Sequence, residues 1–252
     1  MALVFGITKT TSRHNDILNN VGNHHAGERF HLRTYDELKG QSFRDVVFCA
    51  PPSGSTDYAG AVKDASSQLW AGMNSGGKFI FTSAGSVFEG QDGEVVTEAS
   101  MTTDTPRAKR LVDAEGAARS QGAAIILRLA GLYLLERGAH SYWLRSGKDV
   151  DGRSDGIINL LHYDDAAGAC LAALLSDVNN GTFLISDGNP CTRQEICEVA
   201  LKTNKFSDCA MPKFLGTASD PMGKVYDGSW SQGILNWKPK YDSFEAFMSQ
   251  YN

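Results

Sequence analysis

A loop of basic and hydroxyl side chains follows the first apolar segment of the chain. Ala2–Phe5 predicts a short buried strand, and Gly6–His14 (GITKTTSRH) predicts the loop after it. Such side chains suit a bound phosphate, although the same composition also describes a solvated polar turn. A dinucleotide-binding fold normally begins with a strand, a glycine-rich turn and a helix, whereas Gly6 is the single glycine in this loop.

Apolar, strand-like runs alternate with helical stretches along the chain, which is the pattern of an α/β protein. Near-continuous apolar runs suit parallel strands that are covered on both faces. The predicted strands are Ala2–Phe5, Arg29–Leu32, Asp45–Cys49, Lys78–Thr82, Ala124–Arg128 and Thr182–Ile185. The predicted helices are Asn15–Asn20, Asp57–Met73, Arg107–Ser120, Asp165–Ser176 and Arg193–Lys202.

Two helix starts carry capping signals. Asp164 or Asp165 is the expected N-cap of the alanine-rich helix, and Thr192 with Glu195 forms a capping box for the helix after it. From about Cys191 the chain becomes more polar and irregular. This change predicts a domain over residues 1–190 and a small C-terminal lobe over residues 191–252, packed together as one structural unit.

The composition excludes several classes of partner. Hydrophobic residues make up 42% of the 252 residues and charged residues 21%, as in an ordinary globular chain. A net charge of −5 argues against nucleic acid as a main partner, and no apolar run is long enough for membrane insertion. The five scattered cysteines have no C-x-x-C spacing, which predicts reduced thiols in a reducing intracellular compartment. His24 and His25 have no cysteine at ligand spacing, so no metal site is predicted.

Six segments, in order, resemble the atypical and extended branch of the short-chain dehydrogenase/reductase superfamily, the group that includes NAD-dependent sugar epimerases. They are DVVFCAPPSG (Asp45–Gly54), KFIFTSAGSVFEG (Lys78–Gly90), ILRLAGLY (Ile126–Tyr133), INLLHYDDAAGACLAAL (Ile158–Leu174), GTFLISDGNPCTRQEI (Gly181–Ile196) and LNWKPKYDSFEAF (Leu235–Phe247). The resemblance implies a doubly wound parallel sheet of the Rossmann type. Two segments, PPSGSTDYAG (Pro51–Gly60) and RGAHSYWLRSG (Arg137–Gly147), are similar to an uncharacterised group of such proteins in plant and algal plastids.

In this resemblance the segment ALVFG (Ala2–Gly6) matches the second strand of the family. The fold would then lack the first strand and its glycine-rich turn, and such a gap in a sheet is costly to leave empty. Either the given start is too short, or another segment or chain fills the gap, or the strands close together. Alternatively, ALVFG is the first strand and its turn is degenerate.

The family's catalytic residues are incomplete in this sequence. A Ser or Thr at the end of the fifth strand and a Tyr four residues before a Lys perform acid–base chemistry in the family. The Ser position falls on Ala84, which Ser83 and Ser86 flank. No tyrosine occurs in residues 103–115: if Lys109 is the family's lysine, the tyrosine position holds Thr105, whose aliphatic hydroxyl has too high a pKa for this role. In a second register the tyrosine position is nearer Arg107, and Lys109 then belongs to a solvated helix face.

The resemblance also implies a cofactor site. If Gly6–His14 follows the family's second strand, then Lys9, Thr10 and Arg13 lie where the adenosine ribose is read, and basic residues there favour NADP over NAD. The expected cofactor contacts are Thr8, Lys9, Thr10, Arg13, Ala50, Pro51, Pro52, Thr82 and Leu132. Arg137 and His140 follow the sixth strand at the mouth of the expected substrate cleft, where they could hold an anion and move a proton, or else form a salt bridge and a capped turn.

Two functions follow as alternatives. The first is a short-chain dehydrogenase/reductase-like protein that binds NADP(H), acting as a reductase or epimerase on an unidentified small molecule through Ser83, Ser86, Lys109 and His140. The second is a non-catalytic accessory or scaffold subunit of a larger protein complex, or of a homo-oligomer, in the plastid stroma or the cytoplasm. The missing tyrosine favours the second, whereas the basic loop and the Ala50–Pro52 turn favour the first.

Overall fold

The computed structural model describes residues 3–21 and 29–252 of the chain. Ala2 of the first predicted strand, together with His24 and His25, lies outside these residues. The chain divides into two compact units, residues 1–43 and residues 44–252. This division differs from the predicted one at residue 190. Residues on both sides of position 190 belong to one hydrophobic cluster within the second unit.

A parallel pair of strands forms the first unit. β1 (Val4–Thr8) pairs with β2 (Phe30–Thr34). α1 (His14–Val21) follows β1 after a single 3-10 turn at residues 11–13. The ring of Phe5 lies 5.3 Å from the ring of His31 and 5.2 Å from that of Phe43. These contacts give the unit a small aromatic core.

β1 is longer than predicted. It continues to Thr8, so the prediction that a loop begins at Gly6 is wrong. A Cβ atom at Gly6 would lie 2.7 Å from Cδ2 of Leu32, so the glycine allows the Leu32 side chain of β2 to lie across β1. Gly6 therefore serves strand packing, and a turn glycine was the wrong interpretation.

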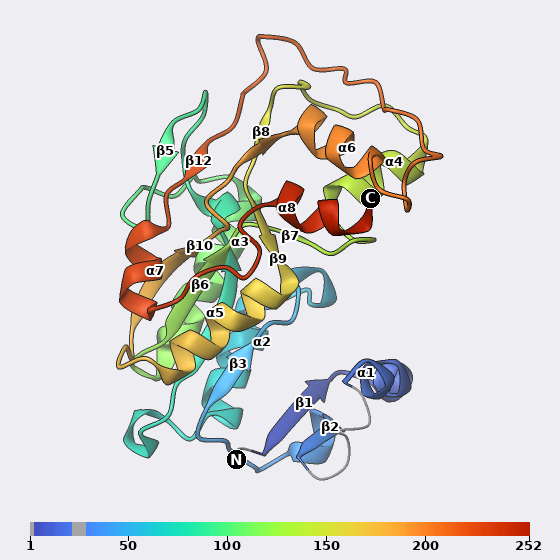
Figure 1. Ribbon diagram of the computed structural model, residues 1–252. Helices are drawn as coiled ribbons and strands as arrows, with labels where there is room; N and C mark the ends of the chain where they lie inside the picture. The colour runs from blue at the N-terminus through green and yellow to red at the C-terminus, as the bar shows by residue number, and fades with distance from the viewer. Residues whose placement is uncertain (1–2, 22–28) are drawn as a thin grey trace. The chain divides into compact units, whose positions relative to one another are not determined.

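A four-stranded parallel sheet is the centre of the second unit (Figure 1), with the order β10-β6-β4-β3. Its strands are β3 (Val46–Phe48), β4 (Phe79–Ala84), β6 (Ile125–Leu129) and β10 (Gly181–Ile185). Each overlaps a predicted strand, and most residues of β4 and β6 are buried, as the apolar runs indicated. Within the described residues β3 is the end strand of this sheet, and whether a further strand belongs beside it remains a prediction.

Helices cover both faces of this sheet, so the predicted Rossmann-like architecture is confirmed. α5 (Tyr163–Leu175) crosses one face in Figure 1, and its alanines share a core cluster with Ile80 of β4. On the other face, Phe81 of β4 packs on Tyr58 of α2 (Tyr58–Asp64), with ring centroids 6.0 Å apart. α3 (Pro106–Ala118) packs beside α2 and β4. Adjacent residues of β4 therefore serve opposite faces of the sheet.

The remaining elements form short ladders and a second core. β7 (Gly131–Tyr133) pairs with β9 (Leu160–His162), β8 (Ile157–Ile158) with β11 (Cys191–Thr192), and β5 (Val95–Val96) with β12 (Val225–Tyr226). The helices are α4 (Ala139–Ser146), α6 (Arg193–Leu201), α7 (Ser229–Leu235) and α8 (Phe244–Met248). Tyr133, Ile196, Phe206 and Phe244 meet in the second core, which joins the C-terminal residues to β7.

Two helix predictions need correction, and one is confirmed. The N-cap of α5 is His162, whose Nδ1 accepts from the Asp164 amide at 3.1 Å; Asp165 instead accepts from the amides of Lys240 and Tyr241. The helix predicted to reach Met73 ends as a π-helical turn at residues 65–69, before Gly72 at φ 83°. The capping box of Thr192 and Glu195 forms as predicted.

Candidate functional site

The carboxyl end of β4 is the natural place for a ligand, because open parallel sheets bind ligands outside the carboxyl ends of their strands. Thr82 at this end donates to the Phe48 carbonyl oxygen at 3.3 Å and so ties β4 to β3. Ala84 ends the strand, and Ser86 is exposed just beyond it. Of the hydroxyl groups that the sequence places here, that of Ser86 is the accessible one.

Ser83 points away from this open end. Its side chain is buried, and its hydroxyl donates to Oε1 of Glu115 on α3 at 2.7 Å. Arg128 of β6 donates to the same carboxylate from Nε at 3.0 Å and from Nη2 at 2.7 Å. The guanidinium carbon of Arg128 also lies 4.6 Å from the ring centre of Phe88. Ser83 is therefore part of a buried ion-pair network, a placement that argues against contact with a ligand.

The start of α3 supplies no acid–base group. Thr105 is the N-cap of α3, and its hydroxyl oxygen accepts from the Ala108 amide at 3.3 Å. Lys109 is exposed on the first turns of the helix. Thr105 therefore has a structural role, in agreement with the argument from its pKa, and Lys109 has no tyrosine on α3 with which to act.

The loop after β3 is held in place from two sides. Arg110 of α3 donates through Nη2 to the carbonyl oxygen of Pro52, at 2.6 Å, and also to that of Ser55. The Tyr58 hydroxyl donates to the Ala50 carbonyl oxygen at 2.8 Å. Ala50 and Pro51 are exposed, and no atom lies within 4 Å of the position that a Cβ atom at Gly54 would take. The expected cofactor turn is thus an exposed, braced loop at the carboxyl end of β3.

The basic loop of the first unit is ordered by its own hydroxyl groups. Thr8 Oγ1 lies 2.6 Å from Nε2 of His14, and Thr10 Oγ1 lies 2.9 Å from Oγ of Ser12. Lys9 and Arg13 are exposed, and their side chains form no ion pair with any residue in the described ranges. Leu132, the remaining expected cofactor contact, is half-buried on β7 and packs on the main core.

The structure places His140 in the second core. It is 1% exposed, its ring lies 5.4 Å from that of Phe206 and 5.1 Å from that of Phe244, and Nε2 lies 2.8 Å from the Leu135 carbonyl oxygen. Burial lowers the pKa of this histidine, which keeps the ring neutral. His140 is therefore enclosed by aromatic rings, and its expected contact with a substrate stays a prediction.

Arg137 is exposed on the surface. Its guanidinium carbon lies 5.0 Å from the ring centre of Tyr163. Arg137 is therefore exposed whereas His140 is buried, although the sequence grouped the two residues.

Tyr226 is a residue that sequence reasoning missed. It lies on β12, far along the chain from β4, yet its ring covers Gly85 directly after the end of β4. Its side chain is 8% exposed. The short segment KVYDG carries no motif, so nothing in the sequence indicated that a tyrosine reaches this place.

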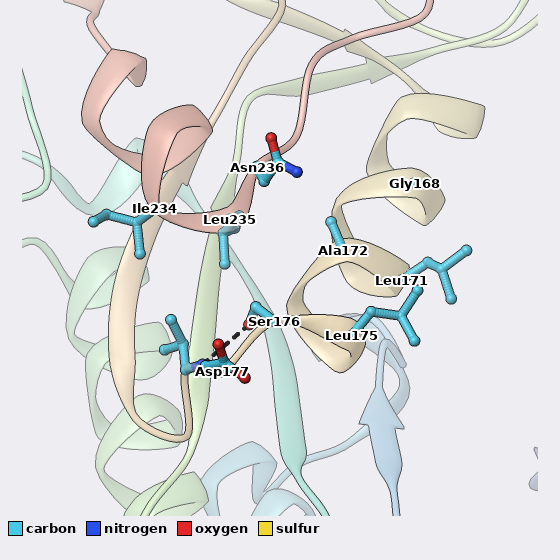
Figure 2. Close-up of a pocket in the computed structure, with 10 residues that line it drawn as sticks. Gly168, Leu171, Ala172, Leu175, Ser176, Asp177, Ile234, Leu235 and Asn236 are labelled. Atoms are coloured by element: carbon cyan, nitrogen blue, oxygen red, sulfur yellow. Dashed lines mark hydrogen bonds between the residues drawn. The ribbon is translucent and has the colours of Figure 1, made fainter.

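A groove of the second unit lies elsewhere. Figure 2 shows it between the end of α5, with Leu171 and Leu175, and the end of α7, with Ile234 and Leu235. Its volume is about 530 Å³. Lys78, just before β4, donates to the carbonyl oxygen of Ser176 in this groove. The groove therefore lies at the end of the sheet where β4 starts, opposite to Gly85.

The described residues fit a bound dinucleotide in part. Two exposed cations and a braced loop stand in segments where such a cofactor is expected to make contacts. A glycine-rich G-x-G-x-x-G turn follows neither β1 nor β3, so the donors that normally hold the pyrophosphate have no counterpart there. Among the described residues no three metal-ligating side chains come together, and no helix is long and apolar enough to cross a membrane.

The fold is shared with known structures. The enzyme WbmG of Bordetella bronchiseptica in complex with NAD is 16% identical, with a TM-score of 0.71 over 99% of this chain and 84% of that one. UDP-glucuronic acid 4-epimerase from Bacillus cereus in complex with NAD is 18% identical, with a TM-score of 0.70 over 99% and 92%. dTDP-glucose 4,6-dehydratase from Bacillus anthracis in complex with NAD is 16% identical, with a TM-score of 0.70 over 99% and 86%.

The chain therefore has the Rossmann-like fold of NAD-dependent epimerases and dehydratases. At these identities the likeness defines the fold alone. The sequence matches no protein-family model and no curated protein.

Proposed function

We propose that this chain is an atypical short-chain dehydrogenase/reductase-like protein that binds NADP(H) and acts as a reductase or epimerase. The fold supports a nicotinamide dinucleotide, because neighbours with this fold are crystallised with NAD. A nicotinamide, when bound, supplies hydride transfer. The name of the Bacillus cereus neighbour makes a nucleotide sugar the first substrate class to test.

The observation that carries NADP over NAD is the pair of exposed cations in the loop after β1. Lys9 and Arg13 flank hydroxyl groups that already bond to one another, so the loop has a defined shape before any ligand binds. A 2′-phosphate would gain charge-assisted hydrogen bonds from both cations, whereas a free 2′-hydroxyl group would not. In the second unit, considered by itself, Arg110 and Tyr58 hold the loop at Ala50–Pro52 in place.

A fluorescence titration with NADPH and with NADH tests this proposal. We expect NADPH to bind more tightly, and the double variant Lys9→Ala/Arg13→Ala to lose at least tenfold in NADPH affinity with no change for NADH. The double variant Lys202→Ala/Lys238→Ala removes the same charge from exposed positions elsewhere and is the control. No binding of either nucleotide at millimolar concentration would rule the proposal out.

A specific observation favours a second function, that of a non-catalytic accessory subunit or scaffold, in a hetero-complex or a homo-oligomer. The family's serine position holds Ala84, the neighbouring Ser83 is engaged by Glu115, and α3 contains no tyrosine. The plastid stroma as its compartment rests on the resemblance of two segments, with the cytoplasm as the alternative. Failure to bind nicotinamide nucleotides, combined with a native mass well above 27.3 kDa, would support this reading.

A further inference from the structure

The ring of Tyr226 occupies the space directly above the end of β4. A Cβ atom at Gly85 would lie 2.5 Å from Cε2 of Tyr226 and 3.0 Å from its hydroxyl oxygen. The phenol group can reach this place only because position 85 is a glycine. The ring therefore lies at Gly85, one residue before the exposed Ser86, at the end of the sheet where parallel α/β folds bind their ligands.

The main chain around Tyr226 is fixed from two directions. The side-chain amide of Asn159 accepts from the Tyr226 amide at 2.8 Å and donates to the Lys224 carbonyl oxygen at 2.8 Å. On the other side β12 pairs with β5, where Tyr226 lies beside Val96. The ring also meets Phe88 edge-on, with centroids 6.3 Å apart. Tyr226 is thus held in one place before any ligand arrives.

The hydroxyl group itself is unengaged. Among residues 3–21 and 29–252 it has no hydrogen-bond partner, although the side chain is more than nine-tenths buried. Unlike the hydroxyl of Tyr133, it is not one of the fully enclosed polar atoms without a partner, so part of its surface stays open. A buried polar group is normally satisfied by a hydrogen bond, and this hydroxyl group is free to form one with a ligand.

The protonation state of Tyr226 suits a donor. Burial raises its pKa to about 12, so the phenol keeps its proton near neutrality. Lys224, just before β12, donates through Nζ to the Phe88 carbonyl oxygen and is thereby engaged elsewhere. Tyr226 can therefore donate a hydrogen bond to an oxygen atom.

We propose that the Tyr226 hydroxyl donates a hydrogen bond to a carbonyl or hydroxyl oxygen of a substrate bound at the end of β4, supplying the phenol that α3 lacks. The inference deepens the proposed function and rests on it for the substrate class, a nucleotide sugar. Tyr226 would be a binding residue for the substrate and not for the cofactor.

Fluorine NMR on protein that carries 3-fluorotyrosine tests the contact directly. The resonance of residue 226 is the one that Tyr226→Phe removes. We expect this resonance to shift when UDP-glucuronic acid is added in the presence of NADP, and the resonance of the exposed Tyr142, assigned with Tyr142→Phe, to stay in place. An unshifted Tyr226 resonance at 10 millimolar (roughly 10,000-fold above a micromolar Kd) would overturn the proposal.

Affinity provides the second readout. Tyr226→Phe keeps the ring and removes one hydroxyl, so we expect binding of UDP-glucuronic acid, measured by calorimetry, to weaken roughly threefold to tenfold. Binding of NADPH should change less than twofold. If Tyr226→Phe does not fold, the variant Gly85→Ala is used in its place, because the added methyl group displaces the tyrosine ring. The same loss of affinity for UDP-glucuronic acid is then expected. Unchanged sugar affinity in the variant that folds would contradict the proposal.

The two proposals fail in different ways. If the native chain does not bind NADPH but its Tyr226 resonance still responds to UDP-glucuronic acid, the cofactor proposal is refuted and the Tyr226 proposal is retained. If the native chain binds NADPH but its Tyr226 resonance does not respond to UDP-glucuronic acid, the Tyr226 proposal is refuted and the cofactor proposal is retained.

Discussion

Arg128 on β6 donates hydrogen bonds to both carboxylate oxygens of Glu115 on α3, and both side chains are almost completely buried. This pair joins the central sheet to the helix in which the family's tyrosine and lysine are expected. Removal of one partner leaves a buried charge without compensation, which is more damaging than removal of both.

We therefore expect Glu115→Gln to lower the free energy of unfolding by about 3 to 5 kcal/mol. The double variant Glu115→Leu/Arg128→Met should recover most of this loss. Urea unfolding followed by circular dichroism measures both, and Asp113→Asn on the exposed side of α3 is the control, with a change of about 0.5 kcal/mol or less. A double variant as unstable as the single one would contradict the interpretation.

A second prediction concerns Asp187, the second residue after the end of β10. One of its carboxylate oxygens accepts from the Asn189 amide at 2.9 Å, and the other is buried without a partner in the described part of the chain. Burial raises its pKa to about 7, and the groups that face it are Tyr133 of β7, Asp165 of α5 and Cys191 of β11.

Because the folded-state pKa of Asp187 lies above the unfolded value near 4, the folded chain binds this proton more tightly. The contribution of this protonation to the free energy of unfolding is fully present below about pH 4 and is lost as the pH rises through about 7. We expect Asp187→Asn to remove this dependence and to raise the free energy of unfolding at pH 8 by about 2 kcal/mol. Thermal melts from pH 4 to 8 measure it, with the exposed Asp208→Asn as control. Parallel pH profiles for native chain and Asp187→Asn would refute it.

Lys78 leads to a third prediction. Its ammonium group donates to the carbonyl oxygens of Ala173, at 2.9 Å, and of Ser176 at the end of α5. A cation here satisfies carbonyl groups that the helix leaves unpaired and opposes the negative end of the helix dipole. Lys78→Met should reduce stability by about 1 to 3 kcal/mol, because it leaves these acceptors buried. Chemical denaturation measures the loss, and a result no larger than that for the exposed Lys63→Met would speak against the cap.

The close approach of Gly85 and Tyr226 can be tested through stability alone. Gly85→Ala places a methyl group within 2.5 Å of the tyrosine ring, so we expect a loss of about 1 to 3 kcal/mol. In the background Tyr226→Ala the same substitution should cost much less, since the ring is gone. A double-mutant cycle with thermal unfolding measures this coupling. Additive effects of the two changes would mean that the two residues do not touch.

Local patterns predicted much of the fold. The apolar runs located all four strands of the central sheet, and the Thr192–Glu195 spacing located the start of α6. Short ladders such as β5–β12 escaped prediction, because two-residue strands have no measurable period. The cap of α5 was misassigned because Asp165 bonds to distant amides of Lys240 and Tyr241, which no local rule can reveal.

The features of the candidate site also divide into those that the sequence determined and those that only the tertiary structure decided. The sequence by itself determined that α3 contains no tyrosine and that cations follow β1, because residue types at local positions need no fold to be known. Only the tertiary structure decided that His140 is enclosed by Phe206 and Phe244, that Ser83 bonds to Glu115, and that Tyr226 covers Gly85. Each of these outcomes depends on contacts between segments far apart in the chain. Packing and burial, rather than spacing along the sequence, determine which side chains remain free to meet a ligand.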